Sequence, residues 1–280
     1  MRKEGLDLYI GAAEQSMQAL LALAEAQQSS EPEEDANLRA IVLVGVTGDG
    51  KSSTGNTLCG ALDAFAVSGG LSSETAGVAH RDYLLIAEEV VEMRVVDTIG
   101  LHDTGLPAEE VMRRFSAFSD LTPSGIDVFL FVVRWGRFRP DHEAAVDAFV
   151  ANCGESALAH TALVFTGCPL GAAELAAALD ASAPESLRRL LEKLPTPPIG
   201  IENVSSPERA RPALHAAVQA VCESNQRRRY SNAALAEARA RHALTRETER
   251  AAFAAAVADW RKGSGPVIVE REYKQGQAGP

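Results

Sequence analysis

The sequence is poor in aromatic residues, which make up 5% of its 280 residues. This scarcity disfavours a protein that stacks nucleobases on aromatic side chains. Cations are also in the minority, with 27 Lys and Arg against 38 Asp and Glu, and the formal net charge is −11. A protein that binds the nucleic-acid backbone normally carries the opposite sign, so we expect no nucleic-acid partner.

Cysteines are few, and none of the four lies in a Cys-x-x-Cys pair (Cys59, Cys153, Cys168 and Cys222). This spacing indicates free thiols in a reducing compartment rather than a zinc site. The sequence also lacks an uninterrupted apolar run of about 18 residues, the length of a membrane span. The N-terminal segment is broken by acids and amides and resembles neither a signal peptide nor a membrane span. We therefore expect a soluble, cytoplasmic protein.

Short apolar runs alternate with stretches of helical periodicity along the middle of the chain. Strands are predicted at 40–45, 82–87, 91–97, 128–133, 162–166 and 198–203. Helices are predicted at 51–60, 107–119, 141–152, 172–193 and 207–224. This alternation predicts an α/β fold of three layers, in which helices cover both faces of a mostly parallel sheet, and the second and third strands form a hairpin.

The two ends of the chain differ in composition from the middle. We expect an N-terminal helix and acidic linker over 1–36, the α/β domain over 39–224, one long Arg- and Ala-rich helix over 225–262 and a flexible tail over 263–280. The basic helix has two interpretations. It folds back onto the acidic domain, which we favour, or it meets an anionic membrane surface or an acidic partner as a peripheral contact.

An apolar stripe marks the far part of the same basic helix. Phe253, Val257 and Trp260 follow one another at i, i+4 and i+7, which places them on one helical face. Such a stripe docks the helix onto the domain or pairs it with another chain as a coiled coil. The histidines, His142 among them, show neither metal-ligand spacing nor a catalytic partner in the sequence.

The segment Gly45–Ser52 matches the phosphate-loop pattern G-x-x-x-x-G-K-[ST], with a predicted strand before it and a predicted helix after it. Glycines let backbone N–H groups turn inward around phosphate oxygens, and the helix N-terminus adds its dipole. Lys51 is expected to reach the β- and γ-phosphates, and Ser52 to ligate Mg²⁺. The residues expected to contact the nucleotide here are Gly45, Thr47, Gly48, Asp49, Gly50, Lys51, Ser52 and Ser53.

A second motif, Asp97-Thr98-Ile99-Gly100, ends the third predicted strand. Asp97 at this position holds Mg²⁺, and the Gly100 amide contacts the γ-phosphate. The alternative is an ordinary turn from strand to loop, because Asp-x-x-Gly is common by itself.

Four segments resemble, in order and spacing, motifs of the immunity-associated (GIMAP or avirulence-induced) GTPases, which are related to the chloroplast import receptor GTPases. They are GVTGDGKSSTGNTLCG (45–60), DTIGLHDT (97–104), VVRWGRFRPDHEAAVDAF (132–149) and CGESALAHTALVFTG (153–167). The resemblance covers roughly residues 39–205. It implies a Ras-like G domain of the P-loop NTPase class that binds GTP or GDP with Mg²⁺ and forms nucleotide-dependent homodimers or oligomers.

The resemblance weakens at the residues that would contact the base. The family's fourth motif resembles T-[RGH]-x-D, and here Thr166 begins it while Pro169 stands at the Asp position. Proline has no side-chain acceptor for guanine, so the guanine preference is implied by the family alone. Asn203 matches the asparagine of the family's fifth motif and is expected to offer the base another contact.

The motif pattern leaves two assignments open: the hydroxyl that completes the Mg²⁺ ligands, and the groups that catalyse hydrolysis. Ser73 and Thr75 are rival ligands to Mg²⁺, and of the two we choose Thr75. Leu101 stands where many small GTPases have a water-orienting Gln, which indicates slow hydrolysis, although His102 could assist. The family implies an arginine finger inserted across a dimer, for which Arg113 and Arg114 are the candidates.

The function expected from these residues is that of a nucleotide-dependent switch or dimerising scaffold. In this interpretation the protein hydrolyses GTP slowly, with Mg²⁺, to GDP and phosphate, and Lys51 takes part in the reaction. The alternative is a degenerate nucleotide-binding scaffold with little hydrolysis or relaxed base specificity, which Pro169 and Leu101 favour. A P-loop kinase is disfavoured, because the sequence shows no separate motif for an acceptor substrate.

Overall fold

The protein is described by a computed structural model that covers residues 38–61, 63–66, 78–86, 90–98, 118–136 and 138–261. The chain divides into a first unit, Met1–Leu38, and a second unit, Arg39–Pro280. All of the first unit except Leu38 lies outside the described residues. The predicted N-terminal helix, the acidic linker and the C-terminal tail also lie outside the described residues, so they stay predictions.

In the described part of the chain, six strands form one sheet in the order β2-β3-β1-β4-β5-β6. Their bounds are β1 Leu38–Val44, β2 Ala79–Ile86, β3 Val90–Asp97, β4 Val128–Arg134, β5 Thr161–Thr166 and β6 Ile199–Ile201. β1 pairs in parallel with β4, β4 with β5, and β5 with β6. β2 and β3 are antiparallel, with Ala79 opposite Asp97 and Ile86 opposite Val90. The mostly parallel sheet and the hairpin predicted from the sequence are therefore confirmed.

Alternate residues of the central strands face two separate apolar clusters. In β4, Leu130 belongs to one cluster and its neighbour Phe131 to the other, and β1 and β5 alternate in the same way. Helices α2 (Lys51–Cys59) and α7 (Pro207–Ser224) complete the first cluster, which includes Leu58 and Leu214. Because both faces of these strands are buried, the sequence shows continuous apolar runs instead of alternation.

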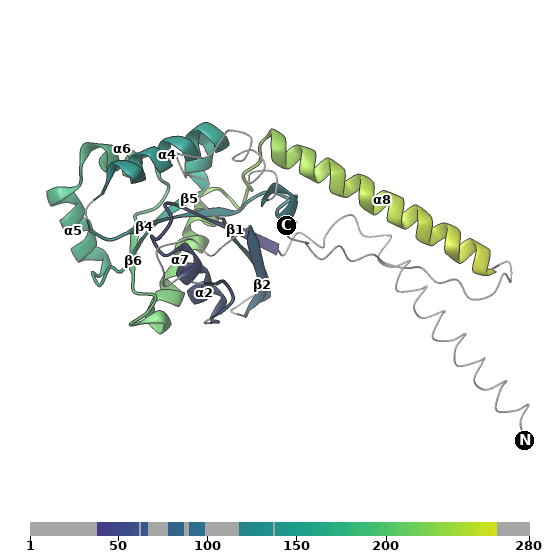
Figure 1. Ribbon diagram of the computed structural model, residues 1–280, viewed down its shortest axis with the longest axis horizontal. Helices are drawn as coiled ribbons and strands as arrows, with labels where there is room; N and C mark the ends of the chain where they lie inside the picture. Colours follow the sequence, from purple (N-terminus) through teal and green to yellow (C-terminus); the bar gives the residue numbers. More distant parts are fainter. Residues whose placement is uncertain are drawn as a thin grey trace, which may run out of the picture. The chain divides into compact units, whose positions relative to one another are not determined.

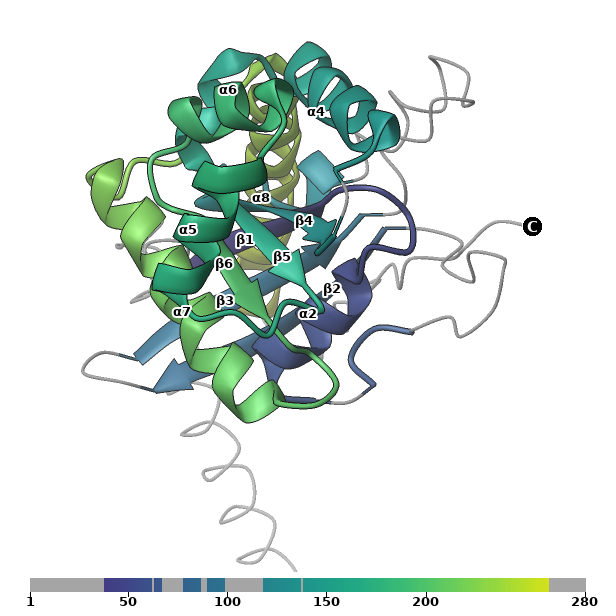
Figure 2. The same ribbon diagram turned by 90° about the vertical axis from the view of Figure 1, so that its left-hand side faces the viewer.

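On the opposite face of the sheet, helices of the described part of the chain cover the second cluster. They are α4 (Pro140–Cys153), α5 (Ala172–Ser182) and α6 (Glu185–Lys193), which contribute Phe149, Leu175 and Leu187. Figure 1 and Figure 2 show α4 and α6 above the sheet and α2 and α7 below it. A short 3₁₀ helix, η2 (Glu155–His160), joins α4 to β5. The expected three layers are therefore present.

Two helices differ from their predicted extents. The single helix predicted over 172–193 is divided, because Pro184 separates α5 from α6 and proline cannot continue a helix from its interior. The basic helix α8 runs over Ala233–Arg261 and so begins later than predicted. Its predicted start is occupied by a turn, in which Gln226 and Arg227 have positive φ values of 53° and 58°.

A bridge and a cap explain why α8 begins where it does. Tyr230 forms an antiparallel bridge with Ile126, so the backbone there is extended rather than helical. The Asn232 side chain then accepts a hydrogen bond of 3.0 Å from the Leu235 backbone N–H, which is the arrangement of an N-cap. Leu235 and Ala238 are buried against the domain.

The basic segment pairs with acids and carbonyl groups of the domain. Arg229 lies 3.3 Å from Asp127, and Arg241 lies 2.6 Å from Asp120. Arg239 donates to the carbonyl oxygens of Pro123 and Ser124. These contacts are those expected if the segment folds back onto the domain.

The far part of α8 is less fully described. The side chains of Phe253, Val257 and Trp260 lie outside the described residues, so the coiled-coil interpretation stays a prediction. Of the helices in the described part of the chain, none combines the length and the apolar character that crossing a bilayer requires.

Candidate nucleotide site

The loops that carry the predicted site residues meet at one edge of the sheet. Because β1, β4, β5 and β6 are parallel, their carboxyl ends point the same way, and ligands of open α/β sheets bind at that edge. The Thr98 hydroxyl donates to the Leu43 carbonyl at 2.6 Å and so brings the end of β3 to the end of β1. The backbone N–H of Trp135 donates to the Thr166 carbonyl, which links β4 to β5.

The phosphate loop begins after β1 with a glycine, and any other residue there would force the neighbouring backbone to move. Gly45 has a φ of 134°, and a Cβ atom there would lie 2.2 Å from the Val132 carbonyl oxygen. Gly48 and Gly50 also have positive φ values, of 88° and 96°. Gly50 caps α2 without a side chain, so no side chain competes with an anion for the first N–H groups of the helix.

Lys51 lies across the phosphate loop. Its Nζ donates to the carbonyl oxygens of Gly45 at 3.0 Å and Val46 at 3.1 Å, and the residue is 8% exposed. The ammonium charge is therefore held beside the loop by bonds that phosphate oxygens could replace. The backbone bend and the cation that the motif predicts are both in place.

Ser52 and Asp97 lie side by side beneath the phosphate loop. The Ser52 hydroxyl donates to Asp97 Oδ2 at 2.6 Å. Asp97 is 2% exposed, and its Oδ1 is buried without a hydrogen-bond partner among the described residues. Burial raises the pKa of Asp97 above its usual value, while the bond from Ser52 and the charge of Lys51 oppose that rise. A buried carboxylate whose second oxygen accepts no hydrogen bond from the described residues is a suitable ligand for a divalent cation.

The protein groups near Asp97 do not form a complete metal cage. Within the described ranges, no group of three or more His, Cys, Asp or Glu residues could hold a metal ion. Mg²⁺ typically keeps several waters and binds through one or two carboxylates together with substrate phosphates. Ser52 and Asp97 therefore fit a Mg²⁺ ion that arrives with a nucleotide.

The residues that follow the phosphate loop explain the S-x-T-G-N pattern in structural terms. The Asn56 side chain pairs with the backbone of Phe65, accepting from its N–H at 2.7 Å and donating to its carbonyl at 3.0 Å. Gly55 is required by close packing, since a Cβ atom there would lie 2.8 Å from the Phe65 ring. These residues hold the chain after α2 against the helix, a role that the sequence pattern alone did not reveal.

At the base end of the site, the two predicted contact residues are engaged with the protein. The Thr166 hydroxyl donates to the Asp49 carbonyl at 2.6 Å. The Asn203 amide donates to Thr54 Oγ1 at 3.0 Å, and the Thr57 hydroxyl donates to Asn203 Oδ1 at 2.8 Å. Both residues thus connect the base loops to the phosphate loop or to α2.

Pro169 follows Thr166 closely along the chain but takes no part in these hydrogen bonds. It is exposed in the loop after β5. Its ring brings no acceptor to the position where the family's aspartate is expected.

A polar cluster beside the phosphate loop was missed by the sequence analysis. Asp49 is 2% exposed, and its Oδ2 lies 2.9 Å from Nε2 of His142, which is fully buried in α4. Arg139 Nη2 lies 3.5 Å from Asp49 Oδ1. Because 93 residues of sequence separate Asp49 from His142 and no motif joins them, only the packing of α4 brings them together.

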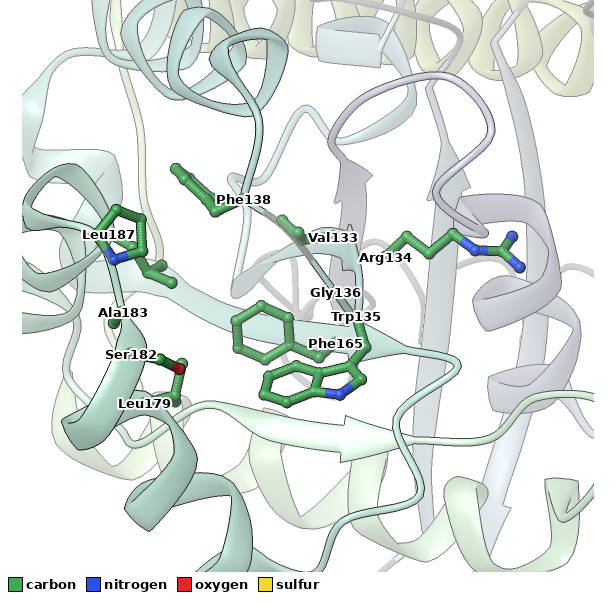
Figure 3. A pocket seen from close by; sticks show the side chains of 11 residues that line it. Val133, Arg134, Trp135, Gly136, Phe138, Phe165, Leu179, Ser182, Ala183 and Leu187 are labelled. Atoms are coloured by element: carbon green, nitrogen blue, oxygen red, sulfur yellow. The ribbon is translucent and has the colours of Figure 1, made fainter.

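A separate apolar pocket of about 470 Å³ lies between the end of β4, β5 and helices α5 and α6. The Trp135 and Phe165 rings meet edge to face across 5.2 Å, and Leu179 and Leu187 lie on the helical side. Figure 3 shows the side chain of Arg134, the charged lining residue, pointing away from these rings. The rings therefore face no charged group of the pocket, and the nucleotide is assigned to the phosphate loop.

Several predicted site residues fall outside the part of the chain that the structure describes. They are the Mg²⁺ candidates Ser73 and Thr75, the γ-phosphate contact Gly100, and the catalytic candidates Leu101, His102, Arg113 and Arg114. Ser53, by contrast, lies at the start of α2, and its carbonyl accepts a hydrogen bond from Thr57.

A phosphate loop between the first central strand and its helix, at the carboxyl edge of a mostly parallel sheet, defines the P-loop class with a G-domain fold. The sequence profile of the AIG1 family matches residues 39–249, and the chain belongs to this family.

Comparison with individual proteins agrees with this family. Immune-associated nucleotide-binding protein 10 of Arabidopsis thaliana is 31% identical over 133 residues, which are 46% of this chain and 28% of the relative. Protein 7 of the same series and organism is 34% identical over 132 residues, which are 45% of this chain and 40% of the relative. The matched segments thus cover less than half of either relative.

A solved structure shares the fold. Its subject is the dimerization and GTPase activity of the chloroplast translocon components atToc33 and psToc159. It aligns with a TM-score of 0.52 and 20% identity, and covers 71% of this chain and 88% of that chain.

Proposed function

We propose that this chain binds GTP and GDP with Mg²⁺ as a G domain, hydrolyses GTP slowly to GDP and phosphate, and acts as a nucleotide-dependent switch or dimerising scaffold. The observation that carries the proposal is the cluster of Lys51, Ser52 and Asp97 beneath a loop of positive-φ glycines. The AIG1 family and the nucleotide-binding relatives support it.

Each part of the cluster has a separate role in this function. The backbone N–H groups from Thr47 to Lys51 bind phosphate oxygens, and the Lys51 ammonium balances the charge of the β- and γ-phosphates. Asp97 Oδ1 and the Ser52 hydroxyl hold the cation or its water shell. Mg²⁺, when bound, neutralises the charge that develops on the phosphates.

The proposed hydrolysis is slow because Leu101 has neither a donor nor an acceptor with which to orient the attacking water. His102 is the neighbouring group that could replace it, and Thr75 would complete the Mg²⁺ ligands. Arg113 and Arg114 are proposed to act in trans, which would make turnover depend on dimerisation. A trans arginine can contribute about 10³–10⁵ in rate.

A second function, a scaffold with relaxed base specificity and little hydrolysis, is favoured by one observation at the base loops. Pro169 provides no acceptor, and the side chains of Thr166 and Asn203 are engaged in hydrogen bonds within the protein. Guanine selectivity would then rest on backbone groups alone.

Equilibrium binding of labelled GTP, GDP and ATP, with and without Mg²⁺, tests the proposal. Wild type should bind GTP and GDP with micromolar or tighter affinity, and Mg²⁺ should strengthen GTP binding. Lys51→Ala should bind nucleotide more weakly. Lys193→Ala, which removes an exposed lysine bound to Glu155, is its matched control and should bind as wild type does. No detectable binding of any purine nucleotide at millimolar concentration would refute the function. Equal affinity for ATP would favour the relaxed scaffold.

Turnover measured over a broad dilution series tests the dimer mechanism. The activity per molecule should rise with protein concentration, and Arg113→Ala or Arg114→Ala should remove that rise while leaving nucleotide binding intact. Flat specific activity across the series would exclude an arginine supplied by a partner. Binding without turnover at any concentration would favour the scaffold.

A further inference from the structure

The phosphate loop of this protein contains a carboxylate, which is an unfavourable group beside a triphosphate. Asp49 lies between two positive-φ glycines, Gly48 and Gly50, in the tip that should surround phosphate oxygens. A free carboxylate there would repel a ligand of charge about −4. In the structure the carboxylate does not face solvent, because the Asp49 side chain is 2% exposed and turned towards α4.

His142 is the group that receives this carboxylate. Its Nε2 lies 2.9 Å from Asp49 Oδ2, and its side chain has no exposed surface. Its other nitrogen, Nδ1, accepts a hydrogen bond of 3.0 Å from the Arg139 backbone N–H. A ring nitrogen that accepts cannot carry a proton, so the imidazole proton is assigned to Nε2, which lies 2.9 Å from Asp49 Oδ2 and 3.1 Å from Arg139 Nη2. The contact with Asp49 is electrostatic, because Oδ2 has no partner at hydrogen-bonding angles among the described residues.

The position of His142 is fixed by its surroundings. It is the third residue of α4, where its ring caps the helix by accepting from Arg139, the N-cap residue. The Phe138 ring packs against the imidazole at a centroid distance of 5.2 Å. The backbone of Asp49 is held separately, by the Thr166 hydroxyl on its carbonyl. The loop is therefore fastened to β5 by its backbone and to α4 by its side chain.

Arg139 contributes to the same arrangement from the surface. Its Nη2 lies 3.5 Å from Asp49 Oδ1, but its Nε bonds Asp141 at 3.0 Å and the side chain is 45% exposed. The guanidinium is shared with a second acid and is screened by solvent, which weakens its hold on Asp49. His142 is thus the buried neighbour of the carboxylate, and Arg139 is its exposed hydrogen-bond donor.

We propose that His142 is a positioning residue for the phosphate loop, which holds the Asp49 carboxylate away from the nucleotide phosphates. This role rests on the proposed nucleotide binding. Without the imidazole, the buried carboxylate would keep only the exposed Arg139 beside it and would turn outward to water, on the side where phosphates bind. The affinity for nucleotide would then fall, and it would fall more as the ligand carries more phosphate charge.

The test compares two replacements of similar volume in the full-length protein. His142→Leu fills the space but removes the donor, whereas His142→Gln keeps an N–H donor at the end of the side chain. We expect His142→Leu to weaken GTP binding by roughly 10- to 100-fold and GDP binding several-fold less, because repulsion increases with ligand charge. His142→Gln should recover most of the wild-type affinity.

Removing the charge of Asp49 is the decisive rescue. In the His142→Leu background, Asp49→Asn should restore the wild-type ratio of GTP to GDP affinity, because no carboxylate remains to repel phosphate. An equal loss for GTP and GDP, or a loss that Asp49→Asn does not restore, would show that His142 only packs α4 and would overturn the proposal. An unchanged affinity in His142→Leu would also overturn it.

The design remains decisive when the single variant does not fold. If His142→Leu is unfolded, the double variant carries the test: a folded protein with wild-type GTP affinity supports the proposal, and an unfolded double variant overturns it. Failure of wild type itself to bind GTP or GDP is a different result. It would refute the proposed nucleotide function before any His142 variant is compared.

Discussion

The two halves of the site are built in different ways. The phosphate half rests on backbone geometry and on buried side chains that bond one another, as in the contacts of Lys51 with Gly45 and of Ser52 with Asp97. The base half consists of exposed loops after β5 and β6, in which Pro169 brings no acceptor. Asn203 spans the two halves, since it belongs to a base loop but bonds Thr54 and Thr57 of α2.

This contrast indicates which property of the protein is fixed and which is adjustable. Changing a residue of the phosphate half disturbs groups that are buried and already paired, so the cost is large. Changing the exposed Pro169 of the base half alters contacts with the ligand but few contacts within the protein. We therefore expect the gain or loss of base selectivity to be independent of folding, and phosphate affinity to be sensitive to every buried group.

The largest effect is expected at the phosphate half. Lys51→Ala should weaken GTP and GDP binding about 100-fold, because charged hydrogen bonds to phosphate are lost in a partly dehydrated site. Titration of a fluorescent nucleotide measures this change, and thermal unfolding without nucleotide confirms that the variant folds. A loss below about fivefold, well under that expected for such bonds, would show that the cation does not reach the phosphates.

Asn203→Ala tests the connection between the halves. It leaves the buried Thr54 and Thr57 hydroxyls with one partner fewer each, so we expect about 1–2 kcal/mol of destabilisation in urea unfolding without nucleotide. Ser205→Ala, in the same loop but exposed, is the matched control and should change stability little. Unchanged stability with weakened GTP binding would instead identify Asn203 as a direct contact of the base.

Pro169→Asp tests whether the base half can be completed. A carboxylate at this exposed position could accept from guanine N1–H and the 2-amino group, so the preference for GTP over ATP should rise roughly tenfold. Competition of ATP and GTP for the labelled nucleotide measures the ratio. Pro169→Ala, which removes the ring and adds no acceptor, should leave the ratio unchanged. The same rise in both variants would mean that the ring, not the missing acceptor, limits selectivity.

The smallest effect is expected in the β2–β3 hairpin, away from both halves. Asp82 accepts two hydrogen bonds from Arg94, at 2.8 and 2.7 Å. Although burial opposes it, this pairing holds the pKa of Asp82 below its usual 3.8. Asp82→Asn should cost at most about 1 kcal/mol near neutral pH, because both side chains are partly solvated, and should not change nucleotide affinity.

The pH dependence of the Asp82 effect has a definite sign. A carboxyl whose pKa is lowered in the folded state stabilises the protein above its unfolded pKa, and this contribution is lost as the pH falls through the lowered value. The difference in stability between wild type and Asp82→Asn should therefore shrink as the pH falls below about 4. Urea unfolding at pH 7 and at pH 3.5 measures the change; a gap that widens in acid would contradict the assignment.

The strands and the phosphate loop could be predicted from the sequence because their signals are local. Apolar runs mark strands that are buried on both faces, and the spacing of Gly45, Gly50 and Lys51 is a property of one short segment. The break at Pro184 was a local signal that the predicted helix over 172–193 ignored. The late start of α8 was not local, since it depends on the bridge between Tyr230 and Ile126.

The site could be predicted where one motif holds all its members, and not where partners come from distant segments. No pattern in the sequence relates Asp49 to His142, or Asn203 to Thr57, because each pair is joined only by the packing of helices on the sheet. The assignment of Asn203 to the base was drawn from its motif position. That base contact stays a prediction, and the structure adds that the Asn203 amide has hydrogen-bond partners within the protein, which a sequence does not display.

By itself, the sequence determined the class of the fold and the position of the phosphate loop, since periodicity and glycine spacing act over a few residues. Only the tertiary structure decided which side chains satisfy one another across the carboxyl edge of the sheet. The physical reason is that buried polar atoms need partners. In a parallel sheet with helical crossovers, those partners come from segments that are far apart in the chain.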